Sequence, residues 1–381
     1  DLRTECLNRR FEEVESFVTL LRQPTAELLD QAGERAAHVG DVSVCADLAA
    51  LARRAPLPAD AAGRAAIVAL EQELARLRVA VEAEQAVAPA TIEDAVARAR
   101  ALAYPPVVAA ALYLAALAGN NASKHADAQR LLEEALLEAE VGGDDLLRFE
   151  IEARLADVTG SWLEQFDEGL RHGELAMAVI RRVNAGPLAE ADVLASLASI
   201  RWRKGEFGPA RELAERALAI SERIDPKGLP VAAYLRSLAV ILNDSDEPEA
   251  SMKAIERGLE IVRAHLGPDH PDIARLLNIR GGDLRRLGRL DEAEADYTHA
   301  LEIFRASVGE SSAEVGFIYT NLGSSLDKRG DYEGAIAQHR RAIAIFERIF
   351  GPTHSRTMGA YERLGSGLSK ARHDEEAVAI L

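Results

Sequence analysis

Apolar residues recur along most of the chain at spacings of three and four, and small residues interrupt them at regular intervals. This spacing places one apolar stripe on each segment and predicts amphipathic helices. Residues that build sheets are scarce, with aromatic residues at 5% of the chain, whereas the strong helix formers Ala, Leu, Arg and Glu are abundant. The pattern therefore predicts an all-α fold.

The helical pattern repeats with a period of 41 to 42 residues. A small residue recurs at Ala217, Gly258, Ala300 and Ala342, and a turn glycine such as Gly330 precedes the second half of several repeats. Small residues allow two helices to cross closely, and glycine supplies the left-handed turn that ends a helix. One such hairpin cannot bury its own stripe, so neighbouring hairpins must stack.

The repeat resembles the tetratricopeptide repeat, and its period and linkers are similar to those of kinesin light chains. The linker residues 266–271 are echoed at 350–355. The residues that carry the resemblance are Leu322-Gly323, Leu326, Gly330, Tyr332, Ala335, Ala342 and Ile345. The resemblance implies a right-handed superhelical solenoid of antiparallel helix hairpins.

We expect capping helices in residues 1–60 and a solenoid of about eight helix pairs in residues 61–381, degenerate in 61–105 and clearer in 106–381. The expected pairs after the degenerate one lie near 107–140, 149–183, 190–224, 230–264, 272–306 and 314–349, with a truncated pair from 356. Both ends fall inside the helical pattern, so we expect a fragment of a longer protein.

Three departures from the pattern make the 232–264 pair the least regular one. Arg280 replaces an expected Leu, the turn 244–246 has no glycine, and Pro248 stands where an aromatic residue is usual.

Residues 1–125 carry a second resemblance, in the runs 6–10, 44–51, 56–60 and 103–106. They are similar to the region that follows the catalytic domain in large bacterial serine/threonine kinases with tetratricopeptide arrays. The resemblance implies a non-catalytic regulatory or docking region.

The sequence contains no phosphate-binding loop, kinase motif, nucleophile elbow or zinc-binding His pair, so we expect no catalytic residue, metal or cofactor. Cys6 and Cys45 are too few for a disulfide framework, and we expect two buried reduced thiols. The net charge of −17 argues against nucleic acid as a partner. The apolar stretch 107–118 is shorter than the roughly 20 residues that span a bilayer, so no membrane insertion is expected.

The remaining candidate site is the groove lined by the first helix of each pair, where Asn and basic residues could bind a peptide backbone and acidic side chains. The expected groove residues are Arg236, Arg275, Asn278, Arg285, Thr320, Asn321, Ser324, Lys328 and Arg363. Asp192, Asp244, Asp327 and Glu362 lie on the same side and oppose a basic groove; a solvated polar groove with no fixed ligand is the alternative.

We therefore expect a protein- or peptide-binding scaffold, whose partner carries acidic groups. The alternatives are a ligand-sensing switch that changes superhelix pitch and a self-assembly module. The expected location is the cytoplasm, or outside it if a transmembrane segment precedes residue 1.

Overall fold

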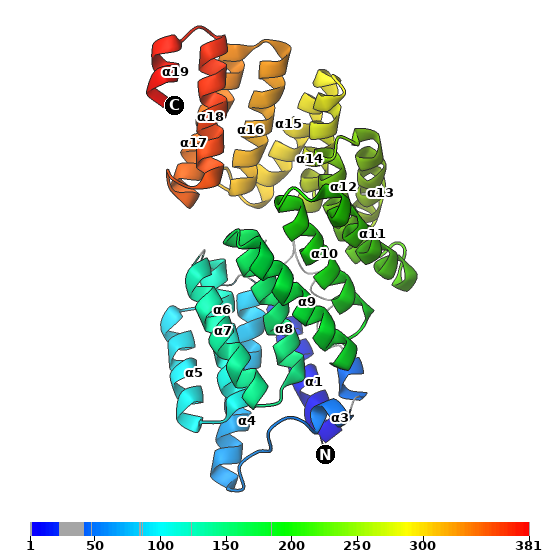
Figure 1. Ribbon diagram of the computed structural model, residues 1–381, viewed down its shortest axis with the longest axis vertical. Helices are drawn as coiled ribbons and strands as arrows, with labels where there is room; N and C mark the ends of the chain where they lie inside the picture. The colour runs from blue at the N-terminus through cyan, green and yellow to red at the C-terminus, as the bar shows by residue number, and fades with distance from the viewer. Residues whose placement is uncertain are drawn as a thin grey trace. The chain divides into compact units, whose positions relative to one another are not determined.

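The structure, a computed structural model, describes residues 2–22, 42–46, 48–83, 85, 87–122, 124–183 and 185–380. Within these ranges every regular element is a helix and no strand occurs, which confirms the all-α prediction. The chain divides into two compact units, residues 1–230 and 231–381, and each is described by itself (Figure 1).

The first unit begins with the helix α1 (Leu2–Leu20), the 3-10 turn η1 (Ser43–Ala46) and the short helix α3 (Leu48–Leu51). Four helix pairs follow, and each helix packs against the next: α4 (Ala61–Glu82) with α5 (Pro89–Leu102), α6 (Pro105–Asn121) with α7 (His125–Val141), α8 (Asp145–Leu155) with α9 (Phe166–Val183), and α10 (Pro187–Arg203) with α11 (Phe207–Ile224). Part of the region predicted to hold capping helices, residues 23–41, lies outside the described residues.

The second unit holds four more pairs, the first of which begins two residues before the unit boundary. They are α12 (Leu229–Asp244) with α13 (Pro248–Leu266), α14 (Pro271–Arg286) with α15 (Leu290–Ser307), α16 (Ala313–Arg329) with α17 (Tyr332–Phe350), and α18 (Ser355–Lys370) with α19 (Asp374–Ile380). The predicted hairpins thus form as consecutive packed helix pairs, with ends that differ from the prediction by a few residues.

Small residues stand where the helices of a pair cross, as predicted. Ala217, Ala300 and Ala342 have no exposed surface. A Cβ on Gly281 would lie 2.6 Å from Cε1 of Tyr297, and one on Gly323 would lie 2.5 Å from Cε1 of His339. Both distances are far below van der Waals contact, so only glycine permits this approach of the two backbones.

Each departure from the repeat pattern has a local solution in the structure. Asp246 adopts the left-handed conformation, with φ 63°, that glycine supplies in other repeats. Pro248 occupies the first turn of α13, where its missing N–H costs no helical hydrogen bond. The guanidinium of Arg280 makes two hydrogen bonds of 2.7 Å to the carboxylate of Asp296, which is otherwise buried.

The first helix of the third pair changes to a π-helical segment, Ala156–Trp162, before it ends. The ring of Trp162 stacks on that of His125 from the preceding pair, with ring centroids 4.8 Å apart. Trp162 nevertheless remains 47% exposed, so this contact lies at the edge of the two pairs.

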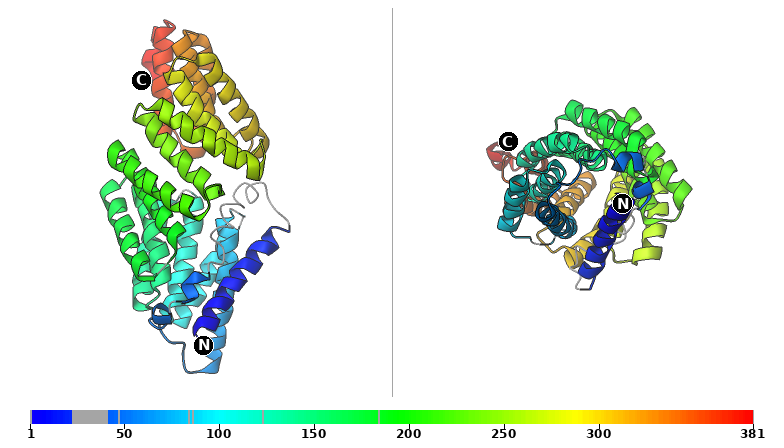
Figure 2. Two further views of the ribbon diagram at one scale, coloured as in Figure 1. Left: turned by 90° about the vertical axis from the view of Figure 1, so that its right-hand side faces the viewer. Right: turned by 90° about the horizontal axis from the view of Figure 1, so that it is seen from below.

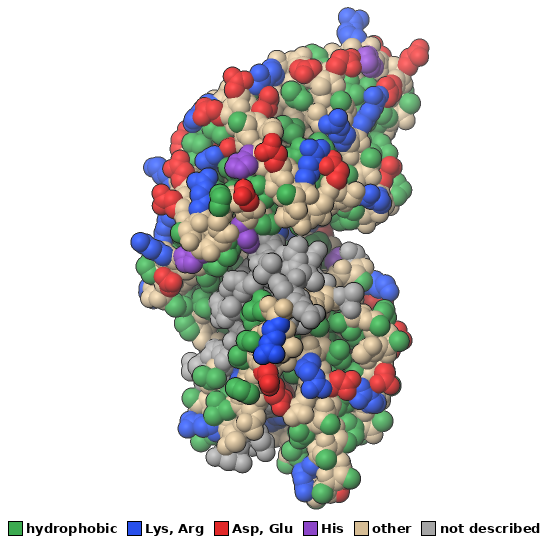
Figure 3. Space-filling model, turned by 180° about the vertical axis from the view of Figure 1, so that it is seen from behind, with side chains coloured by type: hydrophobic (Ala, Val, Ile, Leu, Met, Phe, Trp, Pro, Cys, Tyr) green, Lys and Arg blue, Asp and Glu red, His purple; other side chains and the backbone are tan. Residues whose placement is uncertain are grey.

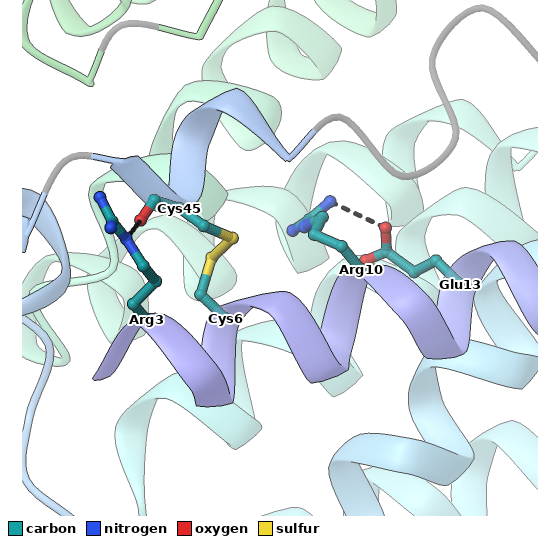
Figure 4. Close-up of a disulfide and its surroundings, with 5 residues drawn as sticks. All are labelled: Arg3, Cys6, Arg10, Glu13 and Cys45. Atoms are coloured by element: carbon teal, nitrogen blue, oxygen red, sulfur yellow. Dashed lines mark hydrogen bonds and ion pairs between the residues drawn. A yellow bond between two sulfur atoms is a disulfide. The ribbon is translucent and has the colours of Figure 1, made fainter. Parts of the chain in front are cut away.

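The prediction of two reduced thiols is wrong, because Cys6 and Cys45 form a disulfide (Figure 4). Their Cα atoms lie 5.6 Å apart, within the usual range for a disulfide, and both side chains are buried. The Nε of Arg3 also donates to the carbonyl oxygen of Cys45 at 3.3 Å. Sequence spacing could not show this pairing, because the packing of the η1 turn against α1 brings the two residues together.

Helix α1 is held at a second place by its packing against α4, the first helix of the first pair (Figure 2). The disulfide and this contact together fix the N-terminal helix to the unit. No helix in the described ranges is both long enough and apolar enough to cross a bilayer.

Candidate functional site

The expected groove residues lie on the first helices of the four pairs of the second unit. Arg236 and Asn278 occupy equivalent positions of α12 and α14, and Asn321 and Arg363 occupy equivalent positions of α16 and α18, one residue further along their helices. Helix α14 contacts α16, and α16 contacts α18, so these first helices form one continuous face. We call this surface the first-helix face.

An amide pair lies at the centre of the first-helix face. Nδ2 of Asn321 donates to Oδ1 of Asn278 at 2.7 Å, which links adjacent repeats. Both side chains are half-buried. The bond leaves Nδ2 of Asn278 and Oδ1 of Asn321 able to donate to and accept from an extended backbone.

Four cations of this face have no carboxylate partner among the described residues. They are Arg236, Arg285, Lys328 and Arg363, and none of them makes an ion pair. Nζ of Lys328 instead donates to the carbonyl oxygen of Arg285 at 2.6 Å, and Nη1 of Arg363 donates to that of Gly359 at 2.9 Å. A guanidinium or ammonium group bonded only to neutral carbonyls still favours an anion.

The other expected groove residues contribute less to such a site. Nη1 of Arg275 is bonded to Oδ1 of Asp272 at 2.8 Å, so its charge is partly neutralised. Thr320 is buried, and its hydroxyl donates to the carbonyl oxygen of Gly316, so it does not face the groove as expected. Ser324 is half-buried and donates to the carbonyl oxygen of Thr320.

Two of the four acidic residues that oppose a basic groove are paired with other cations. Asp327 bonds to Nζ of Lys370, and Asp244 lies 3.5 Å from Nη2 of Arg286. Glu362 is exposed beside Arg363 and offsets one of the four cations without a carboxylate partner, so the cations still outnumber the acidic groups left on the face. Lys370 was not among the expected groove residues, although it stands one repeat after Lys328 and could have been found from that spacing.

A buried carboxyl group lies under the face between α12 and α14. Asp283 has no exposed surface, and burial raises its pKa to about 6. Its Oδ1 accepts a hydrogen bond from Nδ2 of Asn243 at 2.6 Å, while its Oδ2 has no partner. The Asn243–Asp283 contact joins the first two helices of the face in the way that the amide pair joins the next two.

The histidine His339 packs beneath the other end of the face. Burial, followed by the nearby charge of Arg363, lowers the pKa of His339 to about 4. The ring is therefore neutral at physiological pH, and its Nδ1 is buried without a partner. Its close contact with Gly323 makes this histidine part of the helix crossing, not a surface group.

Two histidines cap first helices of the second unit, and the first of them is His270. Its Nδ1 accepts from the backbone N–H of Asp272 at 3.2 Å, and His354 makes the same bond to Arg356. The linkers that begin with Gly267 and Gly351 thus position α14 and α18 identically, and they set the register of the face.

A different polar cluster lies in the first unit, beneath α1. A cavity of about 160 Å³ is lined by charged groups including Arg54 and Arg78. Arg54 is bonded to Glu71 and Asp144, and Arg78 lies 2.7 Å from Glu150. Since these cations are neutralised by their neighbours, the cluster offers no surplus positive charge to a ligand.

The described residues contain no group of three His, Cys, Asp or Glu side chains arranged to hold a metal ion. On the visible face of residues 231–381, acidic and basic side chains are intermixed (Figure 3). The basic character of the first-helix face is therefore a local feature of an acidic protein.

A family model for the tetratricopeptide repeat matches residues 230–306, 272–348 and 314–381. No curated protein sequence matches the chain.

Two of the solved structures that are similar to the chain illustrate the likeness. A Rap protein complexed with competence and sporulation factor is 16% identical, with a TM-score of 0.53, over 84% of this chain and 96% of that one. BtubC (BKLC) from P. vanneervenii is 22% identical, with a TM-score of 0.47, over 57% of this chain and 88% of that one. At these identities the first likeness concerns the fold alone. The family match identifies residues 230–381 as tetratricopeptide repeats.

Proposed function

We propose that this chain is a non-catalytic scaffold that binds an extended, acidic peptide segment of another protein on the first-helix face. The observation that carries the proposal is the set of four cations without carboxylate partners on both sides of the Asn278–Asn321 pair. Amides at the centre can bond to the backbone of the peptide, and the cations can bind its acidic side chains.

Two further observations support this function. The repeat fold supplies a continuous face of first helices, along which an extended segment could lie. The Rap protein of similar fold was solved in complex with competence and sporulation factor, so a protein of this architecture holds a bound factor.

The test is a titration of a labelled oligoglutamate peptide, followed by fluorescence anisotropy, with the wild-type chain and with Asn321→Ala and Arg363→Gln variants. We expect each variant to bind about tenfold more weakly, because a hydrogen bond to a charged or backbone group contributes about 1.4 kcal/mol. An uncharged glycine-serine peptide of the same length should bind far more weakly than oligoglutamate.

The matched control is Arg289→Gln, which removes an arginine from the start of α15, where it is paired with Glu292 at 2.6 Å. This variant should bind as the wild type does. If both groove variants keep their helical content and bind as tightly as the wild type, the first-helix face is not the binding site.

We also propose that this region works in an oxidising compartment, in contrast to the cytoplasm expected from the sequence. The reason is the buried Cys6–Cys45 disulfide, since such bonds persist outside the reducing cytosol. Labelling of thiols in the protein from its native cells tests this. Two reactive thiols after denaturation without reductant would show that the location is wrong.

The link to a kinase remains a proposal that rests on the resemblance in residues 1–125. Under this proposal, the first-helix face binds a regulator of the catalytic domain. The sequence upstream of Asp1 tests it directly, because a kinase domain there would carry the Gly-rich loop and catalytic motifs that this chain lacks.

A further inference from the structure

A cluster of three arginines lies on the other side of the second unit, among second helices. Arg305 belongs to α15, and Arg341 and Arg348 belong to α17. Together with the 308–312 loop and Tyr319 of α16, they line a pocket of about 400 Å³. All three arginines are exposed, so the pocket is open to solvent. None of its lining residues belongs to the expected groove.

The charge of this pocket is not balanced. Glu310 is the only carboxylate that lines it, and it pairs with Arg305 at 2.5 Å. Arg341 and Arg348 make no ion pair with any described residue. Three guanidinium groups therefore face one carboxylate, which leaves a surplus of two positive charges in a protein of net charge −17.

The arginines are held in place by contacts that do not neutralise them. The guanidinium carbons of Arg305 and Arg341 lie 5.7 and 5.5 Å from the ring centroid of Tyr319. Nη2 of Arg348 donates to the carbonyl oxygen of Ser311 at 2.8 Å. These cation–π and carbonyl contacts orient the guanidinium groups. The donors of Arg305 are largely taken by Glu310 and Tyr319, whereas most donors of Arg341 and Arg348 stay available.

Glu310 shows how an oxyanion is bound in this pocket. One of its oxygens accepts from the hydroxyl of Tyr319 at 2.8 Å and from Nη2 of Arg305 at 2.9 Å. These hydrogen bonds, that from Arg305 first, lower the pKa of Glu310. Its side chain remains 58% exposed on the loop, so it occupies the edge of the pocket and leaves the side of Arg341 and Arg348 open.

We propose that Arg305, Arg341 and Arg348 form a binding site for a phosphate monoester. A surplus of two positive charges matches the charge of a phosphate monoester, which approaches −2 at neutral pH. Planar guanidinium groups bind phosphate oxygens through paired hydrogen bonds, and three of them can surround a tetrahedral group. The volume of the pocket accommodates the phosphate together with the group that carries it.

Free inorganic phosphate carries the same kind of charge as the phosphate monoester of a phosphorylated side chain, and two probes separate these ligands. The chain is titrated with inorganic phosphate and with phosphoserine blocked at both ends, by calorimetry in a low-salt buffer. We expect blocked phosphoserine to bind at millimolar or lower concentration, and blocked serine not to bind. Binding of inorganic phosphate alone, or of neither probe, would overturn the proposal.

Variants of the pocket give effects of opposite sign. Arg341→Gln and Arg348→Gln should each weaken the binding of phosphoserine about tenfold, because each removes a charge-assisted hydrogen bond. Glu310→Gln should strengthen it about threefold, since it removes the resident carboxylate from the fork of Arg305. A gain of affinity cannot arise from misfolding, so this variant tests the site even if an arginine variant is unstable.

The matched control is Arg340→Gln, which removes the same charge from the adjacent position of α17, where the arginine pairs with Glu376. It should leave the affinity unchanged. If Arg340→Gln weakens binding as much as Arg341→Gln does, or if Glu310→Gln has no effect, binding follows net charge and the site does not exist.

Discussion

One close helix crossing of the second unit gives a sharp test of the packing rule behind the repeat. Replacing Gly281 of α14 with Ala would place a Cβ 2.6 Å from Cε1 and 2.8 Å from Cζ of Tyr297. The ring of Tyr297 has no exposed surface and cannot swing away into solvent. Either the ring or the helix must therefore move.

The expected change follows from two opposing contributions. Alanine in a helix interior is favoured over glycine by about 1 kcal/mol, whereas overpacking a core of this kind costs about 3 kcal/mol. We expect Gly281→Ala to lower the free energy of unfolding by about 2 kcal/mol. The assay is urea unfolding followed by far-ultraviolet circular dichroism, with the midpoint and slope compared to wild type.

The matched control is Gly359→Ala on α18, where the nearest atom to an added Cβ is Nη1 of Arg363 at 3.4 Å. The flexible end of an exposed arginine can move, so this variant should gain about 0.5 to 1 kcal/mol. The double variant Gly281→Ala/Tyr297→Leu should lose less than the sum of its single variants, since the smaller side chain relieves the overlap. The reasoning is refuted if Gly281→Ala is as stable as Gly359→Ala.

Three further predictions concern the buried polar groups and the disulfide. Removing the Cys6–Cys45 bond by Cys6→Ser/Cys45→Ser should lower the stability of the first unit by about 4 kcal/mol, measured by thermal unfolding with and without reductant; an unchanged midpoint would contradict this. The pKa of His339 in the folded protein is about 4, below its usual 6.5. As the pH falls, this histidine is therefore protonated in the unfolded state before it is protonated in the folded state. The contribution of the neutral His339 to the free energy of unfolding is fully present above pH 6.5 and should fall by about 3 kcal/mol as the pH falls to 4. Urea unfolding of the wild type and of His339→Gln at each pH measures this contribution, and the variant should lose about that much less stability over the same pH range. Arg280→Leu should cost about 3 kcal/mol because it leaves Asp296 buried without a partner, whereas Arg280→Leu/Asp296→Leu should recover most of that loss.

The sequence by itself determined the helix pairs and their crossings. The predicted 314–349 hairpin is found as Ala313–Arg329 and Tyr332–Phe350, and the small residues of the pattern have no exposed surface. This information is local, because an apolar stripe and a small residue one repeat apart already specify which side of each helix is buried. The same register placed Asn278 and Asn321 on the first helices of adjacent pairs, where the structure joins them by a hydrogen bond.

Only the tertiary structure decided which side chains meet across helices. It joined Cys6 to Cys45, paired Arg280 with Asp296, buried Thr320, and gathered Arg341 with other arginines around Tyr319. These contacts depend on the distance and angle at which two helices cross, and a change of an ångström or one helical position alters them. The periodicity of the sequence predicts which face of a helix is buried. The partner of each polar group at the edge of that face is set by packing between segments far apart in the chain.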